Sequence, residues 1–258
     1  NDMLSEGMNK AEIFKAMESR YLCSEEKCDI AYKTAITQKP VLDELEKDSF
    51  SLYVSVPFCP TRCSYCSFVS QSIEGCMKLI PEYVNKLCEE IVYTAKITEK
   101  LGLKLDTVYF GGGTPTTLTA AQLDRVMKVI ANNFDMSTVR EYTVEAGRPD
   151  TITEEKLKVL KANGCGRVSI NPQTLNDSVL EAIGRKHTTA QFFDSFDLAR
   201  KVGFDSINTD IIAGLPTDTV ESFENTIDKL IELAPENITV HTPVSYTHLR
   251  AHETEADL

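Results

Sequence analysis

The sequence has no uninterrupted apolar run of 18 or more residues. A helix needs about 20 apolar residues to cross a bilayer, so no membrane span is expected. No basic segment followed by an apolar one marks a secretory leader either. We therefore expect a cytoplasmic protein without a membrane partner.

Basic residues are in deficit, with 27 Lys and Arg against 39 Asp and Glu, which gives a net charge of −12. A surface of this sign repels phosphate backbones, so a nucleic-acid partner is not expected. Hydrophobic residues make up 42% of the chain and charged residues 26%. These proportions are typical of a folded globular protein rather than a disordered one.

Cysteines are too few for a scaffold built on disulfides, because 258 residues contain only eight of them. Three cysteines, Cys59, Cys63 and Cys66, lie within eight residues, and the other five are scattered. In a reducing cytosol such a tight group indicates a metal centre rather than disulfides. The scattered five are expected to be ordinary thiols.

The chain reads as a polar helical segment, residues 1–50, followed by a region of alternating strands and helices, residues 51–243. Six strand–loop–helix repeats favour an α/β fold with a parallel sheet. Periodicity alone leaves a partial barrel and a doubly wound sheet as alternatives. The expected strands are 52–56, 107–110, 141–146, 167–170, 206–212 and 237–241. The expected helices are 83–101, 120–133, 153–163, 176–184, 189–202 and 219–234.

In both architectures the loops at the carboxyl ends of the strands form the functional edge. The cysteine loop, the glycines 111–113, Glu145 and Gly214 all follow or end a predicted strand. We therefore expect these groups to meet at one edge of the sheet.

The last segment, 244–258, breaks this pattern, and residues 244–254 resemble a translated transposase adapter from sequencing libraries. We expect this tail not to be native and the gene to be truncated here. Its two histidines, His248 and His252, are not expected to bind metal. Because the first residue is Asn1, we also expect the chain to begin inside a longer protein.

The group Cys59-Pro-Thr-Arg-Cys63-Ser-Tyr-Cys66 has the spacing C-x3-C-x2-C. Three thiolates on one loop can bind three irons of a cubane cluster and leave the fourth iron open for a substrate. The alternative is a zinc site, but structural zinc needs four ligands and no second cysteine pair with a suitable spacing is present.

With its neighbours, this motif resembles that of the radical S-adenosylmethionine (SAM) enzymes, whose pattern is C-x3-C-x-aromatic-C, with Tyr65 as the aromatic residue. Within that superfamily the chain is most similar to the oxygen-independent coproporphyrinogen III oxidase group, Firmicute-type branch, and its heme-chaperone relatives. The similarity rests on Tyr53-x-x-x-Pro57-Phe58-Cys59, on 109–116 (YFGGGTPT), on Val144-Glu145-Ala146, on Gln173 and Arg185, and on Asp210-x-x-x-Gly214-Leu215-Pro216. It implies a partial (β/α)6 TIM-like barrel, a [4Fe–4S] cluster and SAM.

The resemblance also implies roles for single residues. Cys59, Cys63 and Cys66 would bind the cluster, and together with Tyr53 they would form the catalytic centre. The predicted SAM contacts are Tyr53, Tyr65, Gly112, Gly113, Thr114, Glu145, Gln173, Arg185 and Asp210.

The chemistry of these residue types suits SAM. Glycine backbone can approach the methionyl amino group, Glu145 can pair with a cationic group, and the planar fork of Arg185 suits a carboxylate. Asp210 interrupts an apolar strand, which is costly without partners, and this favours Asp210 over Gln173 as a ligand. Tyr65 either lines the adenine site or serves packing.

The implied reaction is reductive cleavage of SAM to a 5′-deoxyadenosyl radical, which converts propionates of a porphyrinogen substrate to vinyl groups in heme biosynthesis. An electron donor and a final acceptor, both unidentified, are implied as partners. One departure from the best-known oxidases is Phe68, which replaces an additional cysteine; Firmicute-type relatives and heme chaperones also lack it. Arg148 before Pro149 favours the oxidase branch, because chaperones usually have Asn there. A heme chaperone that retains cluster and SAM remains the alternative.

Overall fold

The computed structural model describes residues 1–68 and 70–242, so the tail with His248 and His252 lies outside the described residues. The chain forms two compact units, Asn1–Ser49 and a second unit that begins at Phe50. Every site residue predicted from the sequence belongs to the second unit. Within the described part of the chain, no helix is both long and apolar enough to cross a membrane.

The first unit is helical, as the sequence predicts. Asn9 caps its second helix by accepting a hydrogen bond from the backbone of Glu12, whose side chain accepts one from Asn9 in return. Ser24 caps the third helix. The two helices are linked by an ion pair of 2.8 Å between Lys10 and Asp29. The helices are α1 (Asp2–Ser5), α2 (Lys10–Tyr21) and α3 (Glu25–Asp43).

The second unit contains a six-stranded sheet in the order β1-β4-β5-β6-β7-β8, and the four pairs from β4 to β8 are parallel. The strands are β1 (Ser49–Val56), β4 (Lys104–Gly112), β5 (Glu141–Glu145), β6 (Arg167–Ser169), β7 (Ser206–Ile212) and β8 (Asn237–His241). All six correspond to predicted strands. A doubly wound sheet reverses its strand order at a switch point, whereas this order follows the chain without reversal. The winding is therefore that of a barrel, which confirms the implied fold.

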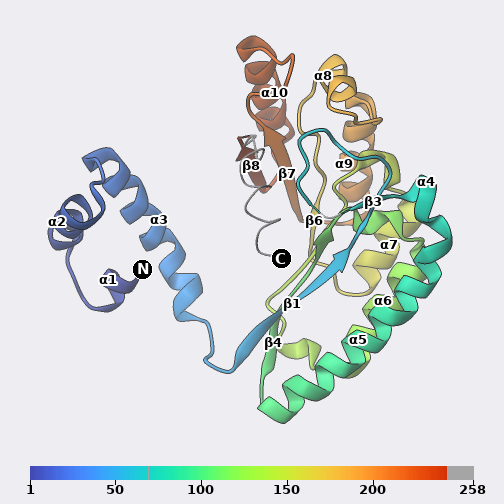
Figure 1. Cartoon of the computed structure of the whole chain (residues 1–258), viewed down its shortest axis with the longest axis horizontal. Coiled ribbons are helices and arrows are strands. Elements are labelled where there is room, and N and C mark those ends of the chain that lie inside the picture. The colour runs from blue at the N-terminus through green and yellow to red at the C-terminus, as the bar shows by residue number, and fades with distance from the viewer. Residues whose placement is uncertain (69, 243–258) are drawn as a thin grey trace, which may run out of the picture. The chain divides into compact units, whose positions relative to one another are not determined.

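Helices cover the outer face of this sheet, and Figure 1 shows α5, α6 and α7 side by side along it. Their apolar side chains form one buried cluster with those of the strands, including Phe110 from β4 and Leu123 from α6. Thr119 caps α6 and Thr153 caps α7, as predicted. The helices are α5 (Ile80–Leu101), α6 (Ala120–Asn133), α7 (Glu154–Ala162), α8 (Asp177–Ala182), α9 (Thr189–Val202) and α10 (Val220–Leu233).

The opposite, inner face of the sheet is polar. Alternate residues of neighbouring strands bond to one another there: Thr107 donates to Ser51 at 2.8 Å, and Asn208 donates to Ser169 at 2.7 Å. A closed TIM barrel instead fills its interior with branched apolar side chains. The hydrophilic inner face therefore forms a wall for polar ligands rather than a second core.

The cysteine loop is surrounded by short elements, and the sequence analysis did not predict these elements. Two-residue strands, β2 (Phe58–Cys59) and β3 (Gln71–Ser72), pair in parallel on either side of it. They are followed by α4 (Ile73–Cys76) and a 3-10 turn, η1 (Met77–Leu79). Such elements are too short for a period to be visible. The further 3-10 turns are η2 (Pro115–Thr117), η3 (Met136–Thr138) and η4 (Pro149–Thr151).

Candidate functional site

A cavity of about 350 Å³ opens at the carboxyl ends of the strands, where Glu145 ends β5, Asp210 lies near the end of β7 and His241 ends β8. Eleven of the twelve predicted site residues line it, although they come from sequence positions as distant as 59 and 210. They are Cys59, Cys63, Tyr65, Cys66, Gly112, Gly113, Thr114, Glu145, Gln173, Arg185 and Asp210. The expected meeting point at one sheet edge is present.

The three cysteines of the loop are half-buried free thiols at this cavity. The loop is held by backbone hydrogen bonds from Ser64 to Ile183 at 3.0 Å and from Cys66 to Cys63 at 3.2 Å. Burial raises the pKa of the Cys66 thiol, and the neighbouring Cys63 and Cys59 raise it further. A metal centre binds cysteines as thiolates, so binding at Cys66 would have to displace the thiol proton that this environment favours.

The arrangement suits a cluster better than a single ion. Over residues 1–68 and 70–242, no three His, Cys, Asp or Glu side chains converge closely enough to hold one metal ion. Structural zinc needs four ligands around one point. The cysteines of a cubane each bind a different iron and so need not converge on one point, and these three line one cavity.

Gly112 and Gly113 line the cavity at positions where the neighbouring atoms leave no room for a side chain. The φ of Gly112 is +97°, in the region that favours glycine, and a Cβ there would lie 2.7 Å from the Ser55 hydroxyl. A Cβ on Gly113 would lie 2.7 Å from the carbonyl oxygen of Phe58 and 3.0 Å from the sulfur of Cys59. These glycines therefore let β4 approach the strand that leads into the cysteine loop.

Glu145 is a half-buried carboxyl group at the end of β5. Tyr109 donates a hydrogen bond of 2.5 Å to its Oε1. Burial raises the pKa of Glu145 above its ordinary value; the bond from Tyr109 opposes this rise, and the nearby Asp210 adds to it. A bound cation would favour the ionised form, so this position suits a cationic ligand group.

Tyr53 is the one predicted site residue that the structure does not place on the cavity wall. It lies on β1, and 56% of it is exposed. Its ring stacks on that of Tyr109, with centroids 5.9 Å apart and planes 11° apart. Because Tyr53 precedes Cys59 by six residues along an extended segment, it lies further down the strand. A direct cofactor contact by Tyr53 stays a prediction.

Arg185 and Gln173 both present unpaired buried atoms. Within the described residues, neither Arg185 Nε nor Gln173 Oε1 has a hydrogen-bond partner. Arg185 Nη1 donates to the carbonyl oxygens of Gly147 and Asn171. Gln173 also has a φ of +66°, which is a strained conformation for a residue with a side chain. Buried polar atoms are costly without partners, so both residues suit a polar ligand.

Asp210 is better satisfied than the sequence suggested. Its carboxylate accepts a 2.7 Å hydrogen bond from Asn208, and its backbone N–H donates to Asn171 Oδ1 at 3.1 Å. His241 Nε2 lies 3.8 Å from the carboxylate. Asp210 was expected to be the better SAM ligand of the two because its carboxylate would lack partners in an apolar strand. In the structure the carboxylate has a partner, and the side-chain oxygen without one among the described residues is Oε1 of Gln173.

Sequence analysis missed several lining residues. Asn171 follows β6 and His241 ends β8, so the rule of strand carboxyl ends could have found both. In the sequence, Arg148 serves only as a marker of the family branch. Tyr65, given either as a ligand or as a packing residue, lines the cavity and also packs against a small apolar cluster that includes Ile183. The missed lining residues are Ser67, Phe68, Gly147, Arg148, Asn171, Ile212, His241 and Thr242.

His187, whose side chain is buried close to this wall, makes stability depend on pH. Burial lowers the pKa of His187 to about 3; Arg185 and Arg148 lower it further, and Asp150 opposes them. Between pH 7 and pH 5 the His187 side chain takes up a proton in the unfolded chain but not in the folded one. Acidification over this interval therefore lowers the free energy of unfolding by about 2 kcal/mol through His187. In urea unfolding of the apoprotein, His187→Gln should lose less stability than wild type over this interval. Equal losses would contradict this account.

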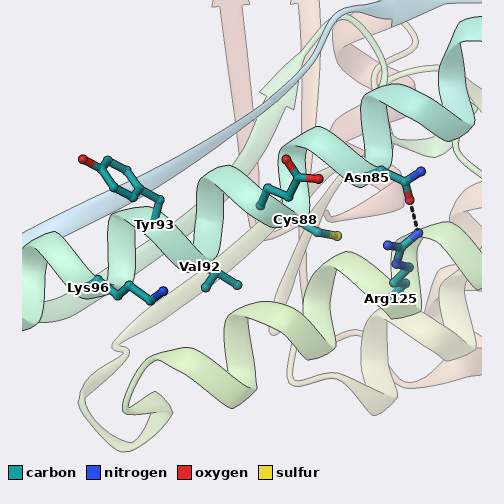
Figure 2. A pocket seen from close by; sticks show the side chains of 7 residues that line it. Asn85, Cys88, Val92, Tyr93, Lys96 and Arg125 are labelled. Atoms are coloured by element: carbon teal, nitrogen blue, oxygen red, sulfur yellow. Dashed lines mark hydrogen bonds between the residues drawn. The ribbon is translucent and has the colours of Figure 1, made fainter.

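A larger hollow of about 510 Å³ lies on the outer surface between α5 and α6 and contains no predicted site residue. Figure 2 shows Arg125 of α6 reaching Asn85 of α5, a hydrogen bond of 2.6 Å. The remaining lining residues, all from α5, are Cys88, Glu89, Val92, Tyr93 and Lys96. This hollow shares no lining residue with the cavity at the strand ends.

Comparison with known proteins assigns the class. The family model described as the radical SAM superfamily matches residues 53–230. A cysteine loop of spacing C-x3-C-x2-C above a parallel partial barrel is the arrangement expected of that class. The chain belongs to the radical SAM superfamily.

Within the superfamily, the chain is related to the coproporphyrinogen III oxidase group. It is 38% identical to the oxygen-independent coproporphyrinogen-III oxidase-like protein HemZ of Bacillus subtilis over 93% of this chain and 48% of that protein. It is also 38% identical to the heme chaperone HemW of the same organism, over 74% of this chain and 50% of HemW. The solved structure of coproporphyrinogen III oxidase HemN from Escherichia coli matches with a TM-score of 0.69 and 33% identity, over 77% of this chain and 45% of that one.

The comparisons also bear on the cofactors and on how much of its relatives' length the chain spans. Membership in the superfamily confirms the predicted [4Fe–4S] cluster and SAM as the cofactors. Which residues contact them stays a prediction. The chain spans about half the length of the relatives it matches.

Proposed function

We propose that this protein is an oxygen-independent coproporphyrinogen III oxidase, which converts propionate side chains to vinyl groups and gives protoporphyrinogen IX. Each propionate would lose one hydrogen atom, carbon dioxide and one electron. The observation that supports the proposal is the joint position of three cysteines and eight further predicted residues around one cavity. Relatives named for this activity support the substrate class.

In this proposal the residues of the chain bind and orient. Cys59, Cys63 and Cys66 would hold the cluster, which with SAM supplies one-electron reductive cleavage. The unpaired Nε of Arg185 would bind the SAM carboxylate, and Glu145 would pair with its amino group. The unpaired Oε1 of Gln173 would accept a hydrogen bond from a hydroxyl of SAM. The polar inner wall would keep the substrate beside the cofactor.

A heme chaperone that retains the cluster and SAM is the second candidate, because relatives named HemW match at 36% and 38% identity. Arg148 before Pro149 favours the oxidase, since chaperone-type chains usually have Asn at that position. Both candidates would work in the reducing cytoplasm, and the oxidase would in addition use an electron donor and a final electron acceptor, both unidentified.

The experiment uses anaerobically reconstituted protein with SAM, a chemical reductant and coproporphyrinogen III. We expect 5′-deoxyadenosine and, from the same reaction, protoporphyrinogen, measured by chromatography after oxidation to the fluorescent porphyrin. A parallel sample is titrated with heme. Stoichiometric heme retention without porphyrinogen turnover would support the chaperone and contradict the oxidase. Formation of 5′-deoxyadenosine checks the cofactor site independently of the substrate.

A further inference from the structure

Arg148 is a buried cation on the cavity wall, and only 3% of it is exposed. Its Nε and Nη2 atoms each lie 3.0 Å from a carboxylate oxygen of Asp150, which forms a bidentate pair. A buried charge requires such a partner. This pairing leaves Nη1 available for a different contact.

The remaining nitrogen, Nη1, reaches the cysteine loop. It donates to the hydroxyl of Thr61 at 3.0 Å and lies 4.0 Å from the sulfur of Cys63. The Thr61 hydroxyl donates in turn to the carbonyl oxygen of Gly184 at 2.9 Å. Thr61 therefore ties the loop to Arg148 on one side and to the residue before Arg185 on the other.

A cation beside a ligand sulfur has a defined consequence for a cluster. Reduction adds one negative charge to the cluster, and a hydrogen-bond donor or positive charge near a ligand sulfur stabilises that reduced form. Asp150 reduces the effect because it lies against the same guanidinium. Arg148 should therefore raise the reduction potential of the cluster, and Asp150 should lower it.

We propose that Arg148 is a positioning residue for the cluster, which holds the segment 61–63 in place and raises the reduction potential of the cluster. The inference rests on the proposed cluster site at Cys59, Cys63 and Cys66. It goes beyond that site because Arg148 belongs to none of the residues assigned to cluster or SAM. The residue would thereby ease electron entry before SAM is cleaved.

The test compares Arg148→Gln, Asp150→Asn and wild type after anaerobic reconstitution, by iron and sulfide content and by a redox titration followed by electron paramagnetic resonance. Arg148→Gln should bind the cluster and lower its reduction equilibrium constant about tenfold, which is about 59 mV for one electron. Asp150→Asn should raise the potential, because the guanidinium loses its counter-charge. A purely structural pair would not give shifts of opposite sign.

A further variant, Thr61→Val, removes the hydroxyl that accepts from Arg148 at 3.0 Å, but keeps the buried cation and its 3.4 Å contact with the Thr61 carbonyl oxygen. It should lower the potential by less than Arg148→Gln. If Arg148→Gln does not fold, the Asp150→Asn variant is the deciding test. A reduction potential in Asp150→Asn that is unchanged or lower than in wild type would overturn the proposal. Full clusters with unchanged potentials in both variants would overturn the role of Arg148 alone. A wild-type protein that takes up no cluster would overturn the cluster site as well.

Discussion

Cys63→Ala is expected to abolish both cluster assembly and SAM cleavage. Cys63 is the middle of the three cysteines, and its loss leaves two thiolates for a cluster that needs three protein ligands here. The backbone bond from Cys66 to the Cys63 carbonyl remains, and the side chain is not part of the buried core. The fold should therefore persist, with stability changed by less than about 0.5 kcal/mol.

The measurements are iron and sulfide content, visible absorption and 5′-deoxyadenosine yield after anaerobic reconstitution. Wild type should give a brown protein that cleaves SAM, and Cys63→Ala should give background values for all three. Cys76→Ala is the matched control, since Cys76 is a half-buried free cysteine that does not line the cavity. A variant at Cys63 that retained a full cluster would contradict the assignment of the loop.

Local elements could be predicted from the sequence because their causes are local. The helix 120–133 has an apolar stripe that includes Leu123 and Ile130 and a Thr119 cap, and it was found at its exact bounds. Barrel and doubly wound sheets share these local units. What separates them is the pairing order of strands far apart in the chain, such as β1 beside β4. That order depends on long-range contacts that no period reveals.

The site was predictable to the extent that it follows from strand ends and motifs. Glu145 and Asp210 could be placed because each lies near the carboxyl end of a recognisable strand. The left-handed backbone of Gln173 and the reach of Arg148 to Thr61, 87 positions earlier, arise only when the loops pack. For the same reason the stacking of Tyr53 on Tyr109, away from the cavity wall, could not be predicted from local patterns.

Gly113→Ala, which adds one carbon atom, is expected to have the second large effect, on both stability and cluster content. The added Cβ would lie 2.7 Å from the carbonyl oxygen of Phe58 and 2.9 Å from that of Val56. Neither oxygen can move freely, because the N–H groups of Gly113 and Thr114 donate to Val56 and Phe58 at 2.8 Å. Relief of the clash would have to displace the strand that leads into Cys59, whose sulfur would lie 3.0 Å away.

Gly113→Ala should therefore destabilise the apoprotein by about 1–3 kcal/mol in urea unfolding, as overpacking does, and should also reduce the iron content after reconstitution. Gly166→Ala is the matched control, because a Cβ there meets nothing within 4 Å and its φ is not in the left-handed region. That variant should unfold within about 0.5 kcal/mol of wild type and keep a full cluster. If the two alanine variants behaved alike, close packing of Gly113 against the cysteine strand could not be what positions Cys59.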